Sequence, residues 1–154
     1  MSVYAEAEIV IDAPIERVWA TMVDIRHYPE WNPFVTQIDC AVADPQVGSD
    51  FILHVAFKGG QKVKTLERVS RLEPPSDGKA LLEYQFLGPL HTLNLVRGKR
   101  QQYLQSLPDG RTRYRTTERL TGLLSFAAPI AKVLDGFERH AAALKRRVEA
   151  QPAA

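Results

Sequence analysis

The chain has 154 residues, of which 45% are hydrophobic and 25% are charged, and this balance is typical of one globular domain with its own core. Its formal net charge is +2, and its basic residues gather only in short runs at 97–100 and 145–147. The concentrated basic stripe of a nucleic-acid-binding domain is missing, so we expect no nucleic-acid partner. Because Cys40 is the only cysteine, an intrachain disulfide and a cysteine-rich zinc site are both excluded.

Sorting signals and cofactor motifs are also missing from the sequence. No secretory signal peptide is visible, and no apolar run approaches the length of about 20 residues that spans a bilayer. We therefore expect a cytoplasmic protein without an integral membrane segment. The four histidines do not fall at metal-ligand spacings and no glycine-rich phosphate loop is present, so we expect neither a metal site nor another cofactor.

The chain begins with one predicted strand and two short predicted helices. Residues 3–11 alternate apolar or small side chains with glutamates, which is the period of a half-buried strand. Pro14 begins a helix whose apolar residues recur at helical spacing. A second short helical segment follows at residues 25–28, and Pro29 and Pro33 prevent it from continuing.

Strands dominate the middle of the chain. Alternating apolar residues, separated by turns rich in glycine and proline, predict strands at residues 35–42, 51–57, 62–72, 80–87, 92–107 and 111–121. Consecutive strands of this kind favour an antiparallel meander with the helices gathered on one face.

The chain ends with a long amphipathic helix. Its apolar residues recur at steps of three and four, which places them on one face: Phe126, Ile130, Val133, Leu134, Phe137, Ala141, Leu144 and Val148. From Pro129 to Val148 such a helix spans roughly 30 Å, enough to lie across a sheet and to enclose a cavity beneath it. Phe137 is expected to face the sheet, whereas Arg139 is expected on the polar side, where its truncation would change stability by less than about 0.5 kcal/mol.

Gly136 is unusual, because a glycine inside a helix costs about 1 kcal/mol relative to alanine. Two explanations remain open at this point. The helix approaches the sheet closely at Gly136, or the glycine leaves room for a ligand.

These elements predict an α+β fold. We expect a curved antiparallel sheet of about seven strands, two short helices after the first strand and a long C-terminal helix over a cavity. Residues 1–150 would form a single domain, and residues 151–154 a disordered tail.

Three local sequences resemble a known superfamily. IDAPIERVW at residues 11–19 resembles its first strand-to-helix corner, YPEWNP at residues 28–33 its second helix, and GFER at residues 136–139 the body of its closing helix. Together with the order of elements, they resemble the START-like superfamily (SRPBCC proteins), which includes polyketide cyclases/dehydratases and lipid-transport proteins. The resemblance implies the helix-grip fold, and hence a START-like ligand-binding domain. It does not decide whether the chain is an enzyme, because this superfamily includes carriers, hormone receptors and cyclases.

The function we expect first is binding or transport of a small, largely hydrophobic molecule, such as a lipid, a quinone or a polyketide-like compound, between the sheet and the last helix. The alternative is a polyketide cyclase/dehydratase-type enzyme that uses polar cavity residues. A third hypothesis is a protein-interaction module that binds through the exposed face of the sheet. A homodimer is compatible with all three.

The residues expected to line the ligand site are mostly aromatic and aliphatic, and they are Trp31, Phe51, Leu53, Tyr84, Tyr103, Glu118, Ile130, Val133 and Phe137. Trp31 fits core packing and pocket lining equally well. Several strands also carry polar residues, among them Thr65, Glu67, Arg97, Arg100, Tyr103 and Glu118. The candidates for catalysis are Glu118, Arg100 and Tyr103, which could polarise a carbonyl or move a proton.

Glu118 shares a strand face with Tyr114 and Leu120, so it is expected to point inward. Depending on the hairpin register, the residue opposite Glu118 is Arg100 or Gln101. Opposite Arg100, we expect an ion pair that lowers the pKa of Glu118; opposite Gln101, burial would raise that pKa and permit acid/base work. The sequence favours a structural or ligand-orienting role for Glu118 over a catalytic one.

Overall fold

The computed structural model describes residues 2–153 as one antiparallel sheet with helices on one face. Its strands are β1 (Ser2–Ile11), β2 (Val35–Cys40), β3 (Asp50–Ala56), β4 (Lys62–Ser76), β5 (Lys79–Leu87), β6 (Arg97–Ser106) and β7 (Thr112–Thr121). The helices are α1 (Ile15–Val23), α2 (Tyr28–Trp31), α3 (Pro89–Thr92) and α4 (Ile130–Glu149), joined by the 3₁₀ turns η1 (Ile25–His27) and η2 (Ser125–Ala127). The strand order β1-β7-β6-β5-β4-β3-β2 confirms the predicted curved sheet of seven strands.

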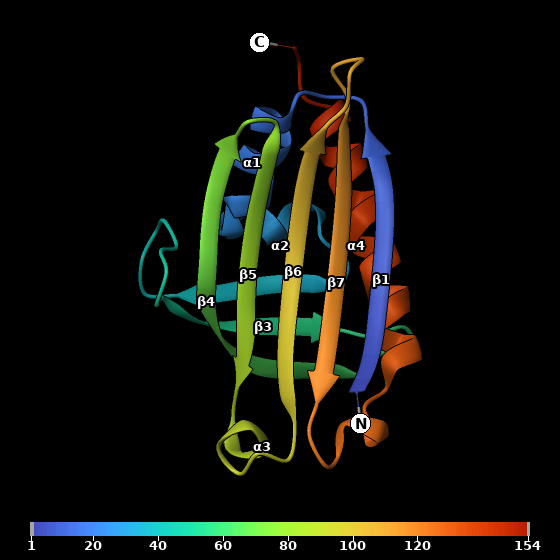
Figure 1. Ribbon diagram of the computed structural model, residues 1–154. Coiled ribbons are helices and arrows are strands. Elements are labelled where there is room, and N and C mark those ends of the chain that lie inside the picture. The colour runs from blue at the N-terminus through green and yellow to red at the C-terminus, as the bar shows by residue number, and fades with distance from the viewer. Residues whose placement is uncertain (1, 154) are drawn as a thin grey trace.

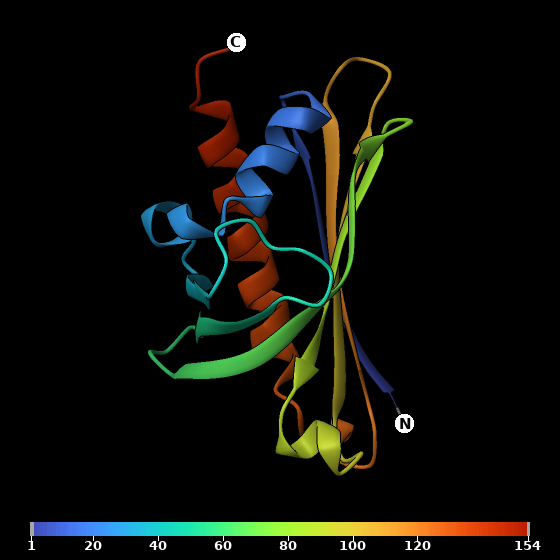
Figure 2. The ribbon, with the colours of Figure 1, turned by 90° about the vertical axis from the view of Figure 1, so that its left-hand side faces the viewer.

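The helices α1, α2 and α4 cover one face of the sheet, and α3 lies at its end (Figure 1 and Figure 2). Figure 2 shows α1, α2 and α4 on the same side, with β3 and the beginning of β4 curling round toward α4. We call the face toward α4 the inner face and the opposite one the outer face. Figure 1 views the sheet from its outer face, where β4 to β7 and β1 lie in front of α4. This arrangement is the predicted α+β fold with a long helix gripped by a curved sheet.

Proline explains two of the predicted boundaries that differ from the structure. The sequence predicts a strand from residue 92, but Pro89 begins α3 and the strand β6 begins only at Arg97. The apolar series of the last helix begins with Phe126, but Pro129 precedes the first residue of α4 and Phe126 lies in η2, where it is 61% exposed. Proline is tolerated only near the beginning of a helix, so α4 cannot extend back to Phe126.

The apolar face of α4 is buried against the sheet along most of its length. Phe137, Ala141, Leu144 and Val148 are all at most 3% exposed, and α4 packs mainly against β1. The last carbonyl groups of a helix have no partners within it, and a side chain from α1 donates to carbonyl groups at the end of α4 and just beyond it. Arg17 donates to the carbonyl oxygens of Val148, at 2.9 Å, and Gln151, at 2.8 Å.

The packed chain therefore continues into the expected tail. The Gln151 side chain also donates to Thr21 Oγ1 at 3.2 Å, so residue 151 belongs to the packed end of α4. Residue 154, the last of the expected tail, lies outside the described residues, as does residue 1 of the expected domain.

Gly136 is explained by close packing and not by room for a ligand. A Cβ atom at this position would lie 2.2 Å from the ring of Phe34, which precedes β2. The Phe34 ring also packs edge-on against Phe137, with ring centroids 6.0 Å apart. The missing side chain thus allows an aromatic ring to lie directly against the helix backbone.

Arg139 is not the free surface residue that the helical pattern predicts. Its guanidinium donates to the carbonyl oxygens of Pro33 and Ala56, each at 3.0 Å, and pairs with Asp135 at 2.8 Å. These contacts tie the middle of α4 to the segment before β2 and to the end of β3. The expected loss below about 0.5 kcal/mol for its truncation is therefore too small, because two carbonyl groups would lose their donors.

We predict that Phe137→Ala lowers the free energy of unfolding by about 3–5 kcal/mol, because the ring is 1% exposed and its removal leaves a void under α4. Leu134→Ala, on the same helix at 36% exposure, should cost less than about 1 kcal/mol. Urea titrations of both variants give the comparison. Similar losses at the two positions would contradict the amphipathic docking of α4.

Candidate functional site

A row of polar side chains crosses the inner face of the sheet beneath α4. Successive residues of a strand point to opposite faces, so Arg100 shares the inner face of β6 with the buried Gln102 and Leu104. In the β6–β7 register Arg100 lies opposite Glu118, and in the β5–β6 register it lies opposite Tyr84. The register thus places Arg100, and not Gln101, opposite Glu118.

The guanidinium of Arg100 is buried among aromatic rings, at 4% exposure. It lies over the Phe137 ring, 4.4 Å from the centroid, and 5.8 Å from the centroid of Tyr84. Its Nε donates to Thr116 Oγ1 at 3.1 Å. Within residues 2–153, no carboxylate oxygen lies within 4.0 Å of this guanidinium. The expected ion pair with Glu118 is therefore wrong, although the expected partner is in register.

The carboxylate of Glu118 extends toward Gly98 of β6 and not toward Arg100 of the same strand. Its Oε1 lies 3.2 Å from the position that a Cβ on Gly98 would take, beside the Cβ of Phe86. Gly98 therefore leaves the space into which the carboxylate extends. Burial raises the pKa of Glu118, and the charge of Arg100 offsets this only in part. A lowered pKa, expected for an ion pair with Arg100, is thus also wrong.

Glu67 on β4 adds a second inward carboxyl group. It lies opposite Phe51 on β3 and Phe86 on β5, and it is 8% exposed. The pKa of Glu67 is raised to about 8, mainly by burial and in part by the charge of Glu118, while Thr65 and Arg100 act in the opposite direction. The sequence singles out Glu67 only as a polar strand residue. Its spacing of two from the apolar Val69 is the signal that places it inward.

Apolar side chains surround this group, which we call the Glu67–Arg100–Glu118 cluster. Of the predicted lining residues, Phe51, Leu53, Tyr84 and Phe137 are buried here, and the rings of Phe51 and Tyr84 meet edge-on with centroids 5.3 Å apart. The remaining apolar neighbours of the inner face are only half-buried, and they are Phe57, Val63, Phe86, Ile130 and Val133.

The half-buried side chains gather where α4 begins. Lys132 in the first turn of α4 donates to the side chain of Gln61, between β3 and β4, at 3.0 Å. This contact joins the turn that carries Phe57 to the helix turn that carries Ile130 and Val133. Toward the other end of α4, Tyr114 and Leu144 are fully buried. The inner face is therefore fully buried toward the C-terminal end of α4 and only half-buried near its beginning.

Trp31 lies away from the cluster, in an aromatic group around His140. Its ring meets Tyr28 at 4.9 Å and His140 at 5.6 Å between centroids, both edge-on. The ring of His140 stacks on Tyr114 with an interplanar angle of 4°. Trp31 thus packs against the core and also lines a small hollow of about 150 Å³ beside α1, which fits both interpretations of this residue.

His140 is fully buried and neutral, which the helical pattern alone does not predict. Burial lowers the pKa of His140 well below its usual value, and the charge of Arg100 lowers it further. Asn32 Oδ1 accepts from the backbone N–H groups of Phe34 and Val35, so its Nδ2 must donate to His140 Nδ1, at 3.0 Å. The proton of the neutral ring then resides on Nε2, which has no hydrogen-bond partner within residues 2–153.

Tyr103 does not belong to this site. It lies at an odd step from Arg100 on β6, so it points to the outer face, where its hydroxyl donates to Gln101 at 3.0 Å. It lines a groove of about 530 Å³ there. Tyr103 is therefore wrong both as a lining residue and as a catalytic candidate of the inner site, because strand residues of opposite parity cannot share a face.

Metal and membrane features can be described for the same part of the chain. Within residues 2–153, no three His, Cys, Asp or Glu side chains gather in a way that could hold a metal ion. None of the helices described there is long and apolar enough to span a membrane.

The raised pKa of Glu67 predicts a specific pH dependence of stability. The folded state holds a proton that the unfolded state has already lost, so the free energy of unfolding should fall as pH rises toward 8. Between pH 6.5 and 8 the fall should be roughly 1–2 kcal/mol larger in the wild type than in Glu67→Gln. Urea titrations at several pH values measure this difference. Glu73→Gln, exposed on the same strand, should keep the wild-type slope; a wild-type slope in Glu67→Gln would contradict the raised pKa.

Comparison with known proteins places the chain in a family. The family model described as "Polyketide cyclase / dehydrase and lipid transport" matches residues 2–151. Among solved structures, the Zhui aromatase/cyclase from Streptomyces sp. R1128 is 17% identical, with a TM-score of 0.76, covering 97% of this chain and 94% of that one. Major latex-like protein 151 from Panax ginseng is 13% identical, with a TM-score of 0.73 and 99% of both chains covered.

A third similar structure is norcoclaurine synthase from Thalictrum flavum, at 13% identity and a TM-score of 0.72, covering 97% of this chain and 95% of that one. At these identities the structures share the fold, and no curated protein matches the chain. The family description covers both cyclases and lipid-transport proteins, so it implies hydrophobic ligand binding or cyclase-type chemistry without choosing between them. Because the family model matches nearly the whole chain, the protein belongs to the polyketide cyclase/dehydrase and lipid-transport family.

Proposed function

We propose that this protein binds a small, largely apolar molecule with an uncharged polar end, between the inner face of the sheet and the beginning of α4. The polar end would meet the Glu67–Arg100–Glu118 cluster. The apolar part would lie along the half-buried Ile130 and Val133 of α4 and the half-buried residues of β4 and β5.

The observation that carries this proposal is a buried guanidinium without an ion pair, next to two inward carboxyl groups. Removing a charge from water is costly unless it is paired and hydrogen-bonded. Arg100 donates to Thr116 Oγ1, lies over the Phe137 ring and has His140 Nδ1 3.5 Å from its Nη2. Within residues 2–153 neither Glu67 nor Glu118 lies within 4.0 Å of its guanidinium. A ligand oxygen that accepts from Arg100 would add a further hydrogen bond to this poorly compensated cation.

The cluster selects against a charged ligand head. Arg100 attracts a negative head and repels a positive one, whereas Glu118 does the opposite in its ionised form. With a pKa of about 8, Glu67 is mostly protonated at neutral pH and can donate to an oxygen atom. A hydroxyl or a carbonyl group satisfies both Arg100 and Glu67 without adding a charge.

Displacement of an uncharged, environment-sensitive apolar dye tests this site. The dye should bind with a saturable isotherm, and decanol should displace it better than decanoate or decylamine, because only decanol has an uncharged head. Val133→Trp should weaken dye binding by at least about tenfold, since the larger ring fills the space that the proposed ligand would occupy beside α4. Leu134→Trp, the same change one residue along the exposed side of α4, should change it by less than about twofold.

Either of two results would refute the binding site. Equal losses in the Val133 and Leu134 variants would place the dye elsewhere. Displacement by decanoate or decylamine with the same affinity as decanol would show that the cluster does not distinguish a charged from an uncharged ligand head.

The raised pKa of Glu67 favours a second candidate function, the cyclase/dehydratase type of chemistry. A protonated Glu67 can give a proton near neutral pH, Glu118 can take one in its ionised form, and Arg100 can polarise a carbonyl group. This is the arrangement that acid/base chemistry on a carbonyl compound requires.

Glu118→Gln separates binding from turnover. The substitution keeps the shape of the side chain and removes its charge, and within residues 2–153 no salt bridge is lost. If the protein is an enzyme, turnover of an aromatic polyketide substrate should fall by about 10²–10⁴-fold while dye affinity stays within about twofold. Full turnover in Glu118→Gln would remove Glu118 from the catalytic group.

A further inference from the structure

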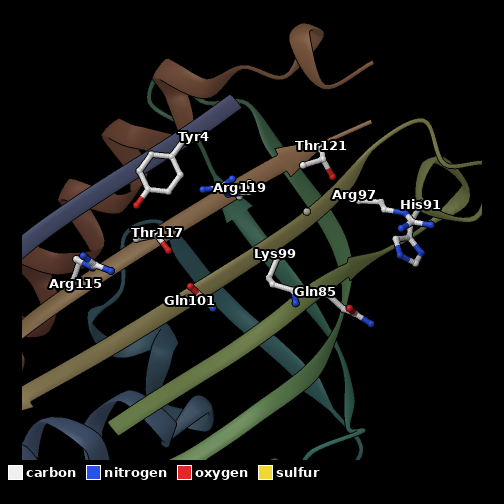
Figure 3. Close-up of a pocket in the computed structure, with 11 residues that line it drawn as sticks. Tyr4, Gln85, His91, Arg97, Lys99, Gln101, Arg115, Thr117, Arg119 and Thr121 are labelled. Carbon is white, nitrogen blue, oxygen red and sulfur yellow. The ribbon is translucent and has the colours of Figure 1, made fainter. Parts of the chain in front are cut away.

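The outer face of the sheet carries a groove that the inner site does not use. It has a volume of about 610 Å³ and crosses four neighbouring strands, from Tyr4 on β1 to Gln85 on β5, with His91 of α3 at one end. Figure 3 shows its side chains on the side of the sheet away from α4. Four of them are cations: Arg97 and Lys99 on β6, and Arg115 and Arg119 on β7.

The positive charge of this groove is largely unbalanced. Lys99 pairs with the buried Glu83 at 3.3 Å. For Arg97, Arg115 and Arg119, no carboxylate of residues 2–153 lies within 4.0 Å. Three unpaired guanidinium groups thus lie in one groove.

The register brings two of these cations directly opposite each other. Lys99 lies directly opposite Arg119 in the β6–β7 pair, and like charges at opposed positions destabilise a sheet. A sheet built for stability alone would place a neutral or acidic residue at one of the two positions. An anionic partner in the groove would offset the repulsion.

The spacing of the cations indicates an extended partner. Arg115 of β7 lies opposite Tyr103 of β6, and Tyr103 is six residues along β6 from Arg97. At roughly 3.3 Å per residue, this separation corresponds to about 20 Å. A single phosphate or carboxylate cannot contact both ends of that distance. Arg97 and Lys99 are two residues apart, and alternate carboxylates of an extended peptide recur at the same step of about 7 Å.

The aromatic residues argue against single-stranded nucleic acid. Such ligands bind through bases stacked on free aromatic rings. Here Arg119 lies over the Tyr4 ring, 5.9 Å from its centroid, and Arg115 lies over the neighbouring Tyr103 ring at 5.1 Å. Both rings already carry a guanidinium group.

We propose that the outer groove binds an extended acidic segment of a partner protein, with glutamate or aspartate side chains at alternate positions meeting the arginines of β6 and β7. This surface lies on the opposite side of the sheet from the ligand site and is independent of it. Ligand binding beneath α4 and protein binding on the outer face would then occupy separate faces of one sheet.

Fluorescence anisotropy with a labelled peptide of alternating glutamate and serine, about ten residues long, tests the proposal. The double variant Arg97→Glu/Arg119→Glu should weaken binding by at least about tenfold. The control Arg26→Glu/Lys58→Glu makes the same change in net charge at positions outside the groove, and it should weaken binding by less than about twofold. Arg119→Gln, a milder change, should give an intermediate loss.

A second readout separates binding from a structural role. Arg119→Glu places a carboxylate opposite Lys99, so the melting temperature of the double variant should stay the same or rise while peptide binding is lost. Equal loss of peptide binding in both double variants would overturn the proposal, because the loss would then depend on the net charge of the protein and not on the groove.

Two other occupants are outcomes that would also overturn it. Tighter binding of a labelled oligothymidylate than of the peptide, lost in the same variant, would identify a nucleic-acid surface. Self-association of the wild type in analytical ultracentrifugation, abolished by Arg97→Glu/Arg119→Glu, would identify a second copy of this chain as the occupant.

Discussion

The guanidinium of Arg100 lies inside the fold with aromatic rings around it and, within residues 2–153, no carboxylate within ion-pair distance. A buried cation of this kind is costly, and the neighbouring groups respond to it. It helps to keep His140 neutral, and it lowers the pKa of Glu67 and Glu118 less than burial raises them. The chemistry of the inner face follows from this one charge and its incomplete compensation.

The position of α4 makes that environment stable. The Phe34 ring occupies the space that a side chain on Gly136 would need, and Arg139 bonds to the carbonyl oxygens of Pro33 and Ala56. These contacts hold the middle of the helix, so the Phe137 ring stays over Arg100. The first turn of α4 is joined to the turn between β3 and β4 by the hydrogen bond from Lys132 to Gln61, and its apolar residues are only half-buried. Rigid support near the cluster and partly exposed apolar surface at the helix start are what a site for a small apolar ligand requires.

Periodicity in the sequence predicts most of the fold and part of the site. Alternation on β7 places Glu118 inward, and the helical spacing of α4 places Phe137 against the sheet, because both patterns are local. The same alternation, applied to β6, puts Tyr103 and Arg100 on opposite faces, so this pattern by itself excludes Tyr103 from the inner site. The spacing of two from Val69 likewise places Glu67 inward.

Other features depend on contacts between distant segments, which no local pattern contains. The ring that fills the space at Gly136 comes from a residue about a hundred positions earlier, and the carbonyl groups bound by Arg139 come from two further segments. The direction of the Glu118 carboxylate depends on Gly98 in the neighbouring strand. For that reason the register predicts which residue faces Glu118, but not whether an ion pair forms.

A structure determined with decanol bound would test the central claim most directly. We expect the hydroxyl group within hydrogen-bond distance of Arg100 or Glu67, and the alkyl chain along Ile130 and Val133 beneath the beginning of α4. Decanol bound only in an outer-face groove, or with its alkyl end at the Glu67–Arg100–Glu118 cluster, would contradict the account.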